Sequence, residues 1–177
     1  VVAAFSQQIY NIKVSDRQDG TFEQYYGTVK VTGNILNGMK EGSWVENHPN
    51  SELPHFIIQY KEGKKDGLYL EFDKQGNIVK KVDYKNDMID GMSHVWRKGG
   101  MLSVKQEYKA GQLHGLSMIY TDKGFIQEES VYKEGKRDGM TIWYSYADKQ
   151  QGPKYVMYTY KDGLFDGVQE TYYEDGR

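Results

Sequence analysis

The sequence contains no cysteine and only three prolines, and it has no long apolar run. The absence of cysteine excludes disulfide bonds and thiolate chemistry, whichever compartment the chain occupies. No stretch is long and apolar enough to span a membrane as a helix. No window combines an apolar stripe of helical period with helix caps, so the sequence predicts no helix.

The motifs of the common enzyme classes are also missing. The sequence has no G-x-S-x-G elbow, no phosphate-binding glycine loop ending in Lys-Ser/Thr and no H-E-x-x-H. Its four histidines, His48, His55, His94 and His114, lack the spacing of metal ligands. A net charge of -2 with interspersed signs gives no basic stripe for nucleic acid. We therefore expect no catalytic residue, no cofactor, no metal and no nucleic-acid partner.

Glycine and tyrosine, by contrast, are abundant, with 20 and 16 residues, and they are periodic. Five octapeptides follow the pattern Y-K-x-G-x-x-D-G. They begin at Tyr60, Tyr84, Tyr108, Tyr132 and Tyr160 and end at Gly67, Gly91, Gly115, Gly139 and Gly167. Successive copies are 24 residues apart, except that the last interval is 28. A fixed period of this length indicates an array of repeats in which each unit packs on its neighbours.

The copies are not identical. A weaker copy covers Ile35 to Gly42, and Gly20 marks the remnant of another. Asp87 replaces a glycine of the second octapeptide, and His114 replaces the aspartate of the third. A four-residue insertion precedes Gly152, and we expect it to lie in a loop, as insertions in repeat proteins do.

The array of about six repeats covers residues 20–177, and residues 1–19 form a separate N-terminal segment that is expected to include a first strand. Residues 1–6 have two interpretations. They are the remnant of a secretory signal peptide, because an apolar run ends in the small-x-small pattern Ala4-Phe5-Ser6, or they belong to an ordinary β-strand. The first interpretation predicts export to the periplasm or cell envelope, and the second a cytoplasmic protein.

Each repeat has the pattern of two β-strands. In the unit from Gly67 to Gly91, two runs of alternating polarity are bounded by Gly, Asp, Asn and Lys, which is typical of antiparallel hairpins. The predicted fold class is all-β: an elongated, twisted antiparallel sheet of stacked β-hairpins, with about 24 residues per repeat. A second set of glycines suits turn positions with positive φ: Gly76, Gly100, Gly124, Gly152 and Gly176. We expect the closing glycines of the octapeptides to be turn residues as well, and the motif aspartates to accept hydrogen bonds from amides of their own turns.

Alternation along the strands assigns side chains to two faces. Odd positions after the closing glycine, such as Leu68, Leu70 and Phe72, form a largely apolar face, whereas even positions form a mixed face that water tolerates. Aromatic side chains on a single-layer sheet serve either as an interface or as a structural ladder. The candidate partner-binding face consists of Tyr69, Val95, Ile119 and Trp143.

A row of lysines follows the repeat tyrosines: Lys61, Lys85, Lys109, Lys133 and Lys161. One interpretation is an edge that binds anionic lipid headgroups. The other is that the lysines serve solubility and turn structure, because acidic neighbours such as Glu62, Glu134 and Asp162 dilute any positive field.

The octapeptide, followed by a short aromatic strand and a second glycine turn, resembles the MORN repeat-variant family over Ile35 to Gly176. The resemblance implies a single-layer sheet of successive hairpins with no enzymatic site of its own. Bacterial relatives are often labelled as antitoxin components of toxin-antitoxin systems, and other MORN proteins are regarded as protein-binding scaffolds or membrane-associated modules.

Residues and resemblance together predict a non-enzymatic scaffold that binds a protein partner or a second copy of itself, and that is antitoxin-like if the partner is a toxin. An exported cell-envelope or membrane-surface module is the alternative. A hydrolase or a carbohydrate-binding protein that uses the aromatic face is the third and weakest class.

Overall fold

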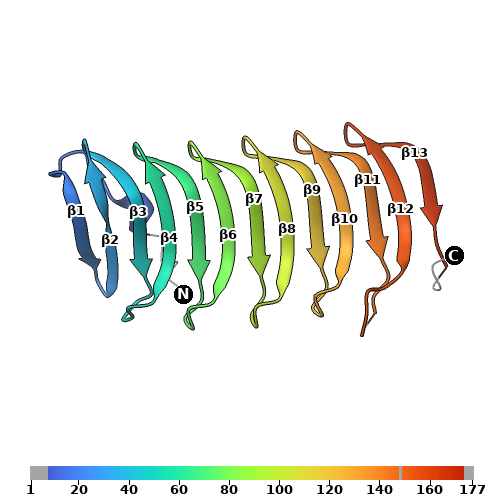
Figure 1. Cartoon of the computed structure of the whole chain (residues 1–177), viewed down its shortest axis with the longest axis horizontal. Helices are drawn as coiled ribbons and strands as arrows, with labels where there is room; N and C mark the ends of the chain where they lie inside the picture. Colours follow the sequence, from blue (N-terminus) through green and yellow to red (C-terminus); the bar gives the residue numbers. More distant parts are fainter. Residues whose placement is uncertain (1–7, 148, 174–177) are drawn as a thin grey trace. The chain divides into compact units, whose positions relative to one another are not determined.

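The structure is a computed structural model that describes residues 8–147 and 149–173. The signal-peptide interpretation of residues 1–6 therefore lies outside the described residues. The chain divides into two compact units, residues 1–88 (unit 1) and residues 89–177 (unit 2). In both units, strands and the turns between them account for almost all described residues (Figure 1).

Unit 1 is built from one helical turn and antiparallel strands that pair in sequence order. Its elements are α1 (Gln8–Asn11), β1 (Gly20–Tyr26), β2 (Val29–Leu36), β3 (Met39–Asn47), β4 (Pro54–Lys61), β5 (Lys64–Phe72) and β6 (Ile78–Lys85). Each strand pairs with the one that precedes it, in a single layer.

Unit 2 repeats this arrangement. Its strands are β7 (Met88–Trp96), which begins at the last residue of unit 1, β8 (Leu102–Lys109), β9 (Gln112–Tyr120), β10 (Ile126–Lys133), β11 (Lys136–Tyr144), β12 (Lys154–Lys161) and β13 (Leu164–Thr171). The predicted all-β fold, a single-layer antiparallel sheet of stacked β-hairpins, is confirmed.

The segment before the array differs from the prediction. Residues 8–11 form a helical turn, and residues 12–19 contain no strand, so the strand expected before residue 20 is not found in the described part of that segment. Ile9, Ile12 and Val14 are buried. The segment therefore packs its apolar side chains on the sheet instead of adding a strand to it.

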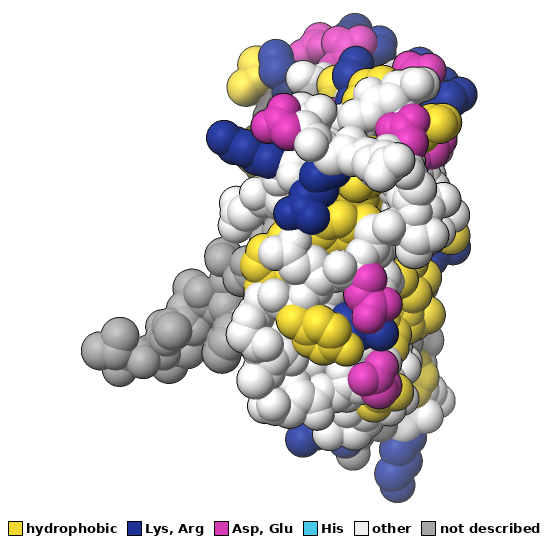
Figure 2. Space-filling model, turned by 90° about the vertical axis from the view of Figure 1, so that its left-hand side faces the viewer, with side chains coloured by type: hydrophobic (Ala, Val, Ile, Leu, Met, Phe, Trp, Pro, Cys, Tyr) yellow, Lys and Arg dark blue, Asp and Glu magenta, His cyan; other side chains and the backbone are white. Residues whose placement is uncertain are grey.

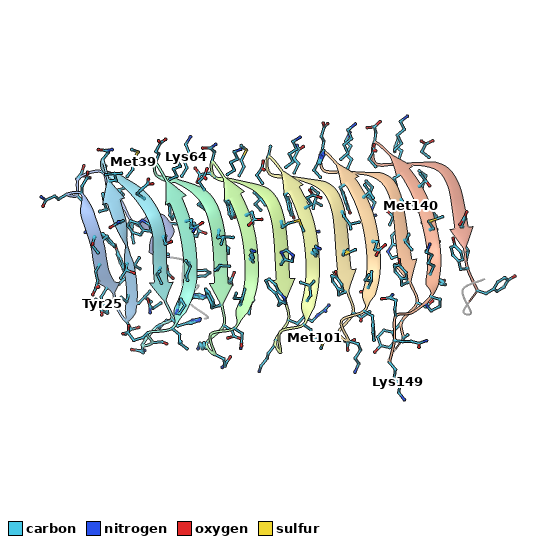
Figure 3. All side chains as sticks on the ribbon, viewed as in Figure 1. Tyr25, Met39, Lys64, Met101, Met140 and Lys149 are labelled. Carbon is cyan, nitrogen blue, oxygen red and sulfur yellow. The ribbon has the colours of Figure 1, made fainter. Side chains whose placement is uncertain are left out.

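Two-residue turns follow the Tyr-Lys pair of each octapeptide and Ile35-Leu36 of the weaker copy, and both residues of each turn have positive φ. The pairs are Asn37-Gly38, Glu62-Gly63, Asn86-Asp87, Ala110-Gly111, Glu134-Gly135 and Asp162-Gly163. This is the type I′ geometry that matches the twist of a hairpin. Asp87 adopts a φ of 67°, so the turn survives the loss of its glycine. In unit 1, Met39 and Lys64 directly follow two of these turns and lie along one edge (Figure 3).

The closing glycine of the octapeptide does not lie in the turn, which corrects the sequence-based expectation. Gly67 lies inside β5 with a φ of +107°. Between the pairs Ile58↔Tyr69 and Tyr60↔Lys65, the three residues around Gly67 oppose Gln59 alone, forming a β-bulge. Gln59 Oε1 fills the gap by accepting a hydrogen bond of 2.7 Å from the Leu68 amide. Equivalent bulges occur in the hairpins β2-β3, β8-β9, β10-β11 and β12-β13.

Three of the motif aspartates also act differently from the prediction, because Asp66, Asp90 and Asp138 contact the turn of the following hairpin instead of their own. Their carboxylates accept from Asn86 N (Asp66, 3.3 Å), Ala110 N (Asp90, 3.0 Å) and Asp162 N (Asp138, 3.2 Å). Glu41 in the weaker copy accepts from Glu62 N at 2.8 Å. The carbonyl just before each of these acids accepts from the second turn residue, as in Asp87 N to Lys65 O at 2.9 Å. The motif therefore links successive hairpins.

The second set of glycines largely follows the prediction. Gly76, Gly100 and Gly124 have φ values of 84°, 81° and 82° in the loops opposite the two-residue turns. Gly152 is an exception, since it does not have a positive φ. A Cβ there would lie 1.8 Å from Ser145 O, so close backbone approach requires the glycine. The four-residue insertion lies in this loop, between β11 and β12, as expected, and Gly176 lies outside the described residues.

The burial of the two faces is the reverse of the prediction. The even positions Tyr69, Ser117 and Thr141 are buried, whereas the odd positions Leu116 and Met140 are 39% and 49% exposed. The even positions share a face with the repeat tyrosines, whose large rings flank them. Alternation separates two faces, but it does not reveal which face larger neighbours will cover.

We expect Gly115→Val to destabilise unit 2 by roughly 2 kcal/mol or more, because a β-branched residue is strained at positive φ. Gly115 has a φ of +99°, and an added Cβ would lie 2.1 Å from Glu107 Oε2. Hydrogen exchange should accelerate in β8, β9 and β10 before β12 and β13, with Leu116→Val as the control. Equal acceleration throughout unit 2 would contradict coupling between neighbours only.

We expect His114→Asp to raise the melting temperature, because it restores the carboxylate found at this position in the other repeats. The new side chain would accept from the Glu134 amide, as Asp138 accepts from Asp162 N. A hydrogen bond of this kind contributes about 1 kcal/mol. His114→Ala is the matched control and should give no increase, and an equal melting temperature for both variants would rule out the proposed bond.

Candidate functional site

The repeat tyrosines of each unit lie on one face of its sheet, which we call the tyrosine face. In unit 1, Tyr84 is opposite Gly67, and Tyr69, two residues further along β5, is opposite Val82. Residues directly opposite one another in an antiparallel pair share a face. Burial raises the pKa of Tyr60, and burial likewise raises the pKa of Tyr84. The tyrosine face is therefore the better-covered side of the sheet.

In unit 2 the tyrosine face carries a row of large side chains across the strands. Direct pairing connects, in order, Val95, Val104, Ile119, Glu128, Trp143 and Val156. These six residues belong to six successive strands, β7 to β12. We call this the Val95–Val156 row. Its one charged member, Glu128, is largely buried, with 14% of its side chain exposed.

A second row on the same face is small and polar. It contains Ser93, Gln106, Ser117, Ser130 and Thr141, which direct pairing again connects, and we call it the hydroxyl row. Gln106 Nε2 donates to Ser117 Oγ at 3.2 Å and Tyr108 OH donates to Gln106 Oε1 at 3.1 Å. Buried polar groups are normally bonded in this way. The hydroxyl of Thr141 is buried without a hydrogen-bond partner among the described residues.

Arg137 and Glu128 organise the part of this face formed by β10 and β11. Arg137 Nη2 lies 2.6 Å from Glu128 Oε1, and Trp143 Nε1 donates to Glu128 Oε2 at 2.9 Å. The guanidinium lies over Trp143 at 5.5 Å and over Tyr160 at 5.6 Å. Cation–π contacts of this kind are worth about 0.5–2 kcal/mol each. The carboxylate therefore fixes both an arginine and a tryptophan.

Aromatic rings extend this cluster over β12 and β13. Tyr158 lies edge-on to Trp143 at 5.6 Å and contacts Phe165 at 5.1 Å. Phe165 also contacts Tyr160 at 4.8 Å, and it is 70% exposed. An exposed ring in contact with an ordered aromatic cluster is typical of an interface.

In unit 1 the row equivalent to the hydroxyl row is large and apolar. It contains Trp44, Ile58, Tyr69 and Val82, all buried. The N-terminal segment contributes further apolar side chains here: Ile9 is fully buried, and Ile12 and Val14 nearly so. The tyrosine face of unit 1 is thus occupied by residues of the same chain.

Backbone groups of Ile9 bind charged side chains of β3. The Ile9 amide donates to Glu46 Oε2 at 3.0 Å, and Lys40 Nζ donates to the Ile9 carbonyl. Lys65 Nζ lies 5.3 Å from the Tyr10 ring centre. Burial lowers the pKa of Lys40 to about 8 and raises the pKa of Tyr10. The segment is therefore held by specific polar contacts as well as by apolar burial.

One repeat position, which the sequence analysis did not single out, supplies these cations. It lies two residues before the closing glycine and is occupied by Lys40, Lys65 and Arg137. Each cation stands over the repeat tyrosine of the following hairpin, at 5.2 Å for Lys40 and Tyr60 and 4.2 Å for Lys65 and Tyr84. The signal was available in the sequence, since the equivalent residues Ile89, Leu113 and Phe165 are apolar.

The structure places the four candidate interface residues on the tyrosine face but does not make them equivalent. Val95, Ile119 and Trp143 belong to the Val95–Val156 row of unit 2 and are half-buried. Tyr69 lies in unit 1, in the buried apolar row, and is 5% exposed. Tyr69 therefore does not offer a free surface. Arg137, Glu128 and Phe165 were not predicted from the sequence as site residues.

Two histidines whose spacing in the sequence does not match that of metal ligands lie in contact in the structure. The rings of His48 and His55 stack at 4.4 Å, with His55 Nδ1 4.0 Å from Glu46 Oε1. Burial, and then the neighbouring His48, lower the pKa of His55 to about 4. In the described part of the chain, no group of three or more His, Cys, Asp or Glu residues is arranged to hold a metal ion.

The surface also carries the lysine row and, in unit 2, a hollow beside a loop. All five lysines that follow the repeat tyrosines are exposed. Where the β1 end of unit 1 faces the viewer, basic and acidic side chains are intermixed (Figure 2). A hollow of about 250 Å³ in unit 2 is lined by Arg97, Asp122 and Tyr146, among others. The Arg97 guanidinium donates to the carbonyls of Thr121 and Tyr120 at 2.8 and 2.9 Å, so it fixes the loop.

No family model matches the chain, and no curated protein matches it. Among residues 8–147 and 149–173, no helix has the length and apolarity that crossing a membrane requires.

The lowered pKa of Lys40 predicts that the stability of unit 1 depends on pH. This pKa is lowered on folding, so between pH 8 and 10.5 the unfolded chain binds more protons at Lys40 than the folded chain does. The stability of unit 1 should therefore rise with pH over this range. From pH 7 to 9 we expect the free energy of unfolding of unit 1 to rise by about 1 kcal/mol relative to Lys40→Met. Chemical denaturation at both pH values measures this difference. A parallel pH dependence of wild type and variant would show that Lys40 is not the group responsible.

Proposed function

We propose that this chain is a non-enzymatic repeat scaffold that binds a protein partner through the tyrosine face of unit 2. The observation that carries the proposal is the ordered cluster of Arg137, Trp143, Tyr158 and Phe165, with Phe165 70% exposed at its end. Arginine, tryptophan and tyrosine are the residues most enriched among binding hot spots.

The pairing of the strands of unit 2 favours an extended binding surface over contact with a partner at a single residue. The Val95–Val156 row crosses successive strands of unit 2, and every one of its members is held in place by backbone pairing to a neighbour. A pre-ordered surface loses little conformational entropy on binding. The sequence adds that no enzyme motif is present. An antitoxin role would be the special case in which the partner is a toxin, and it rests on the family resemblance alone.

Affinity capture from an extract of the native host tests this proposal. The full chain is compared with a row variant, Val95→Ser/Ile119→Ser/Trp143→Ser. We expect the row variant to lose the partner by about tenfold or more, because half-buried large side chains supply the contact energy. Quantitative mass spectrometry measures recovery, and the captured protein is then bound to the purified chain by calorimetry.

The matched control carries serine on the opposite face of the same strands, at Met92, Met118 and Ile142. Pairing of Met118 with Lys105 and Glu129 places it on that face. The control variant should retain the partner. Equal recovery by the row variant and the wild type, with both variants folded by circular dichroism, would exclude this face. Export to the cell envelope or attachment to a membrane surface stays a prediction of the sequence.

A further inference from the structure

The N-terminal segment shows what the tyrosine face can hold. In unit 1, residues 8–14 place Ile9, Ile12 and Val14 in buried positions over the sheet. The bound piece is a single helical turn followed by irregular chain, not an added strand. The tyrosine face thus receives a short segment through its side chains and a few backbone groups.

A cation at the repeat position before the acid is central to this contact. Lys40 donates to the carbonyl of Ile9 while standing over Tyr60, and Lys65 stands between Tyr84 and the ring of Tyr10. The tyrosine ring of the following hairpin therefore orients each cation toward the segment. Either cation can donate to a neutral carbonyl, so the occupant needs no charge of its own.

Unit 2 has the same elements around Arg137. Arg137 occupies the repeat position of Lys40 and Lys65 and stands over Tyr160, as those lysines stand over Tyr60 and Tyr84. Glu128 lies 2.6 Å from it, whereas in unit 1 Lys40 and Glu46 each bind the backbone of Ile9. Trp143, Tyr158 and Phe165 provide the apolar surface. Within the described residues of unit 2, no segment of the chain lies over this cluster in the way residues 8–14 lie over unit 1.

Two polar groups of this cluster lack the partners that buried groups normally have. Arg137 Nε and Thr141 Oγ1 are buried and make no hydrogen bond within the described structure, and Thr141 is fully buried. In unit 1 the row equivalent to Thr141 is apolar, with Trp44 and Ile58. The floor of the tyrosine face is therefore more polar in unit 2 than in unit 1, and because both unbonded atoms are buried they are out of reach of an occupant.

We propose that the tyrosine face of unit 2 binds a short segment of a partner protein with the chemistry of residues 8–14. This segment has an aliphatic or aromatic side chain that packs on Trp143 and Phe165, and a backbone carbonyl that accepts from Arg137. The proposal rests on the proposed scaffold function and specifies its partner: a linear segment of neutral or mixed charge, not a folded surface.

Selection of linear peptides on the full chain tests the proposal. A phage-displayed library of random heptapeptides is selected against the immobilised protein, and the enriched peptides are synthesised with a fluorescent label for anisotropy titration. We expect enriched peptides to carry two apolar residues three apart, as Ile9 and Ile12 are. Their affinity should fall by about tenfold or more in Trp143→Ser and in Arg137→Gln, since each variant removes a central contact.

Two variants separate binding from folding. Arg137→Lys keeps a cation over Tyr160, as in unit 1, and should bind the peptides within about threefold of wild type, because Lys also donates to a carbonyl. Met157→Ser alters the opposite face of β12, where Met157 pairs with Ile142, and should bind like wild type. Peptides that bind Arg137→Gln and Trp143→Ser as tightly as wild type would overturn the proposal.

The outcomes also distinguish this proposal from the scaffold function. If the row variant loses a captured partner but no peptide is enriched, the scaffold function stands and the linear-segment proposal fails. If peptides are enriched and Trp143→Ser abolishes their binding, while the row variant captures every partner as well as wild type does, the face binds linear segments but the proposed scaffold function fails.

Discussion

The interaction on which the structure depends is the bond from the turn of one hairpin to the strand of the preceding hairpin. An acid and the carbonyl before it accept both amides of the next two-residue turn, as Asp66 and Lys65 do for Asn86 and Asp87. A lone hairpin is marginal in water, and the turn amides would otherwise depend on water alone. Because this bond recurs in both units, it accounts for the fixed spacing of the motif.

The bulge at the closing glycine follows from the same arrangement. Asp66 is one of the three bulged residues, and together with Lys65, which pairs with Tyr60, it presents a carboxylate and a carbonyl to the next turn. The positive φ of Gly67 makes this bulge possible without strain. The same short stretch places the cation of Lys40, Lys65 or Arg137 over the next tyrosine. One octapeptide therefore determines a turn, a bulge, a link between hairpins and a cation site.

Much of the fold could be predicted from the sequence because glycine and tyrosine recur at a fixed period. The period predicted hairpins and the loop position of the insertion, and the family resemblance implied the single layer. The functions of Gly67 and Asp66 were misjudged because residues close together in sequence were assumed to bond locally. The actual partner of Asp66 lies 20 residues further along, at Asn86.

The candidate site was only partly predictable. Alternation correctly placed Val95, Ile119 and Trp143 on one face, but it could not show that Tyr69 is buried beneath its surroundings. Arg137 and Glu128 belong to different strands, and only the register brings their side chains to 2.6 Å. His48 and His55 likewise meet because a loop reverses the chain between them.

The link between hairpins also has a consequence for how such a chain can change length. Each hairpin that another follows offers it the same carbonyl and, except at His114, an acid, so gain or loss of one whole 24-residue module that carries the acid leaves both connections intact. The added module leaves the tyrosine face and the opposite face of the sheet on their original sides, because the bulges recur with it. The area of the tyrosine face can thus grow in discrete steps through gene duplication, while the side chains of each module diverge independently.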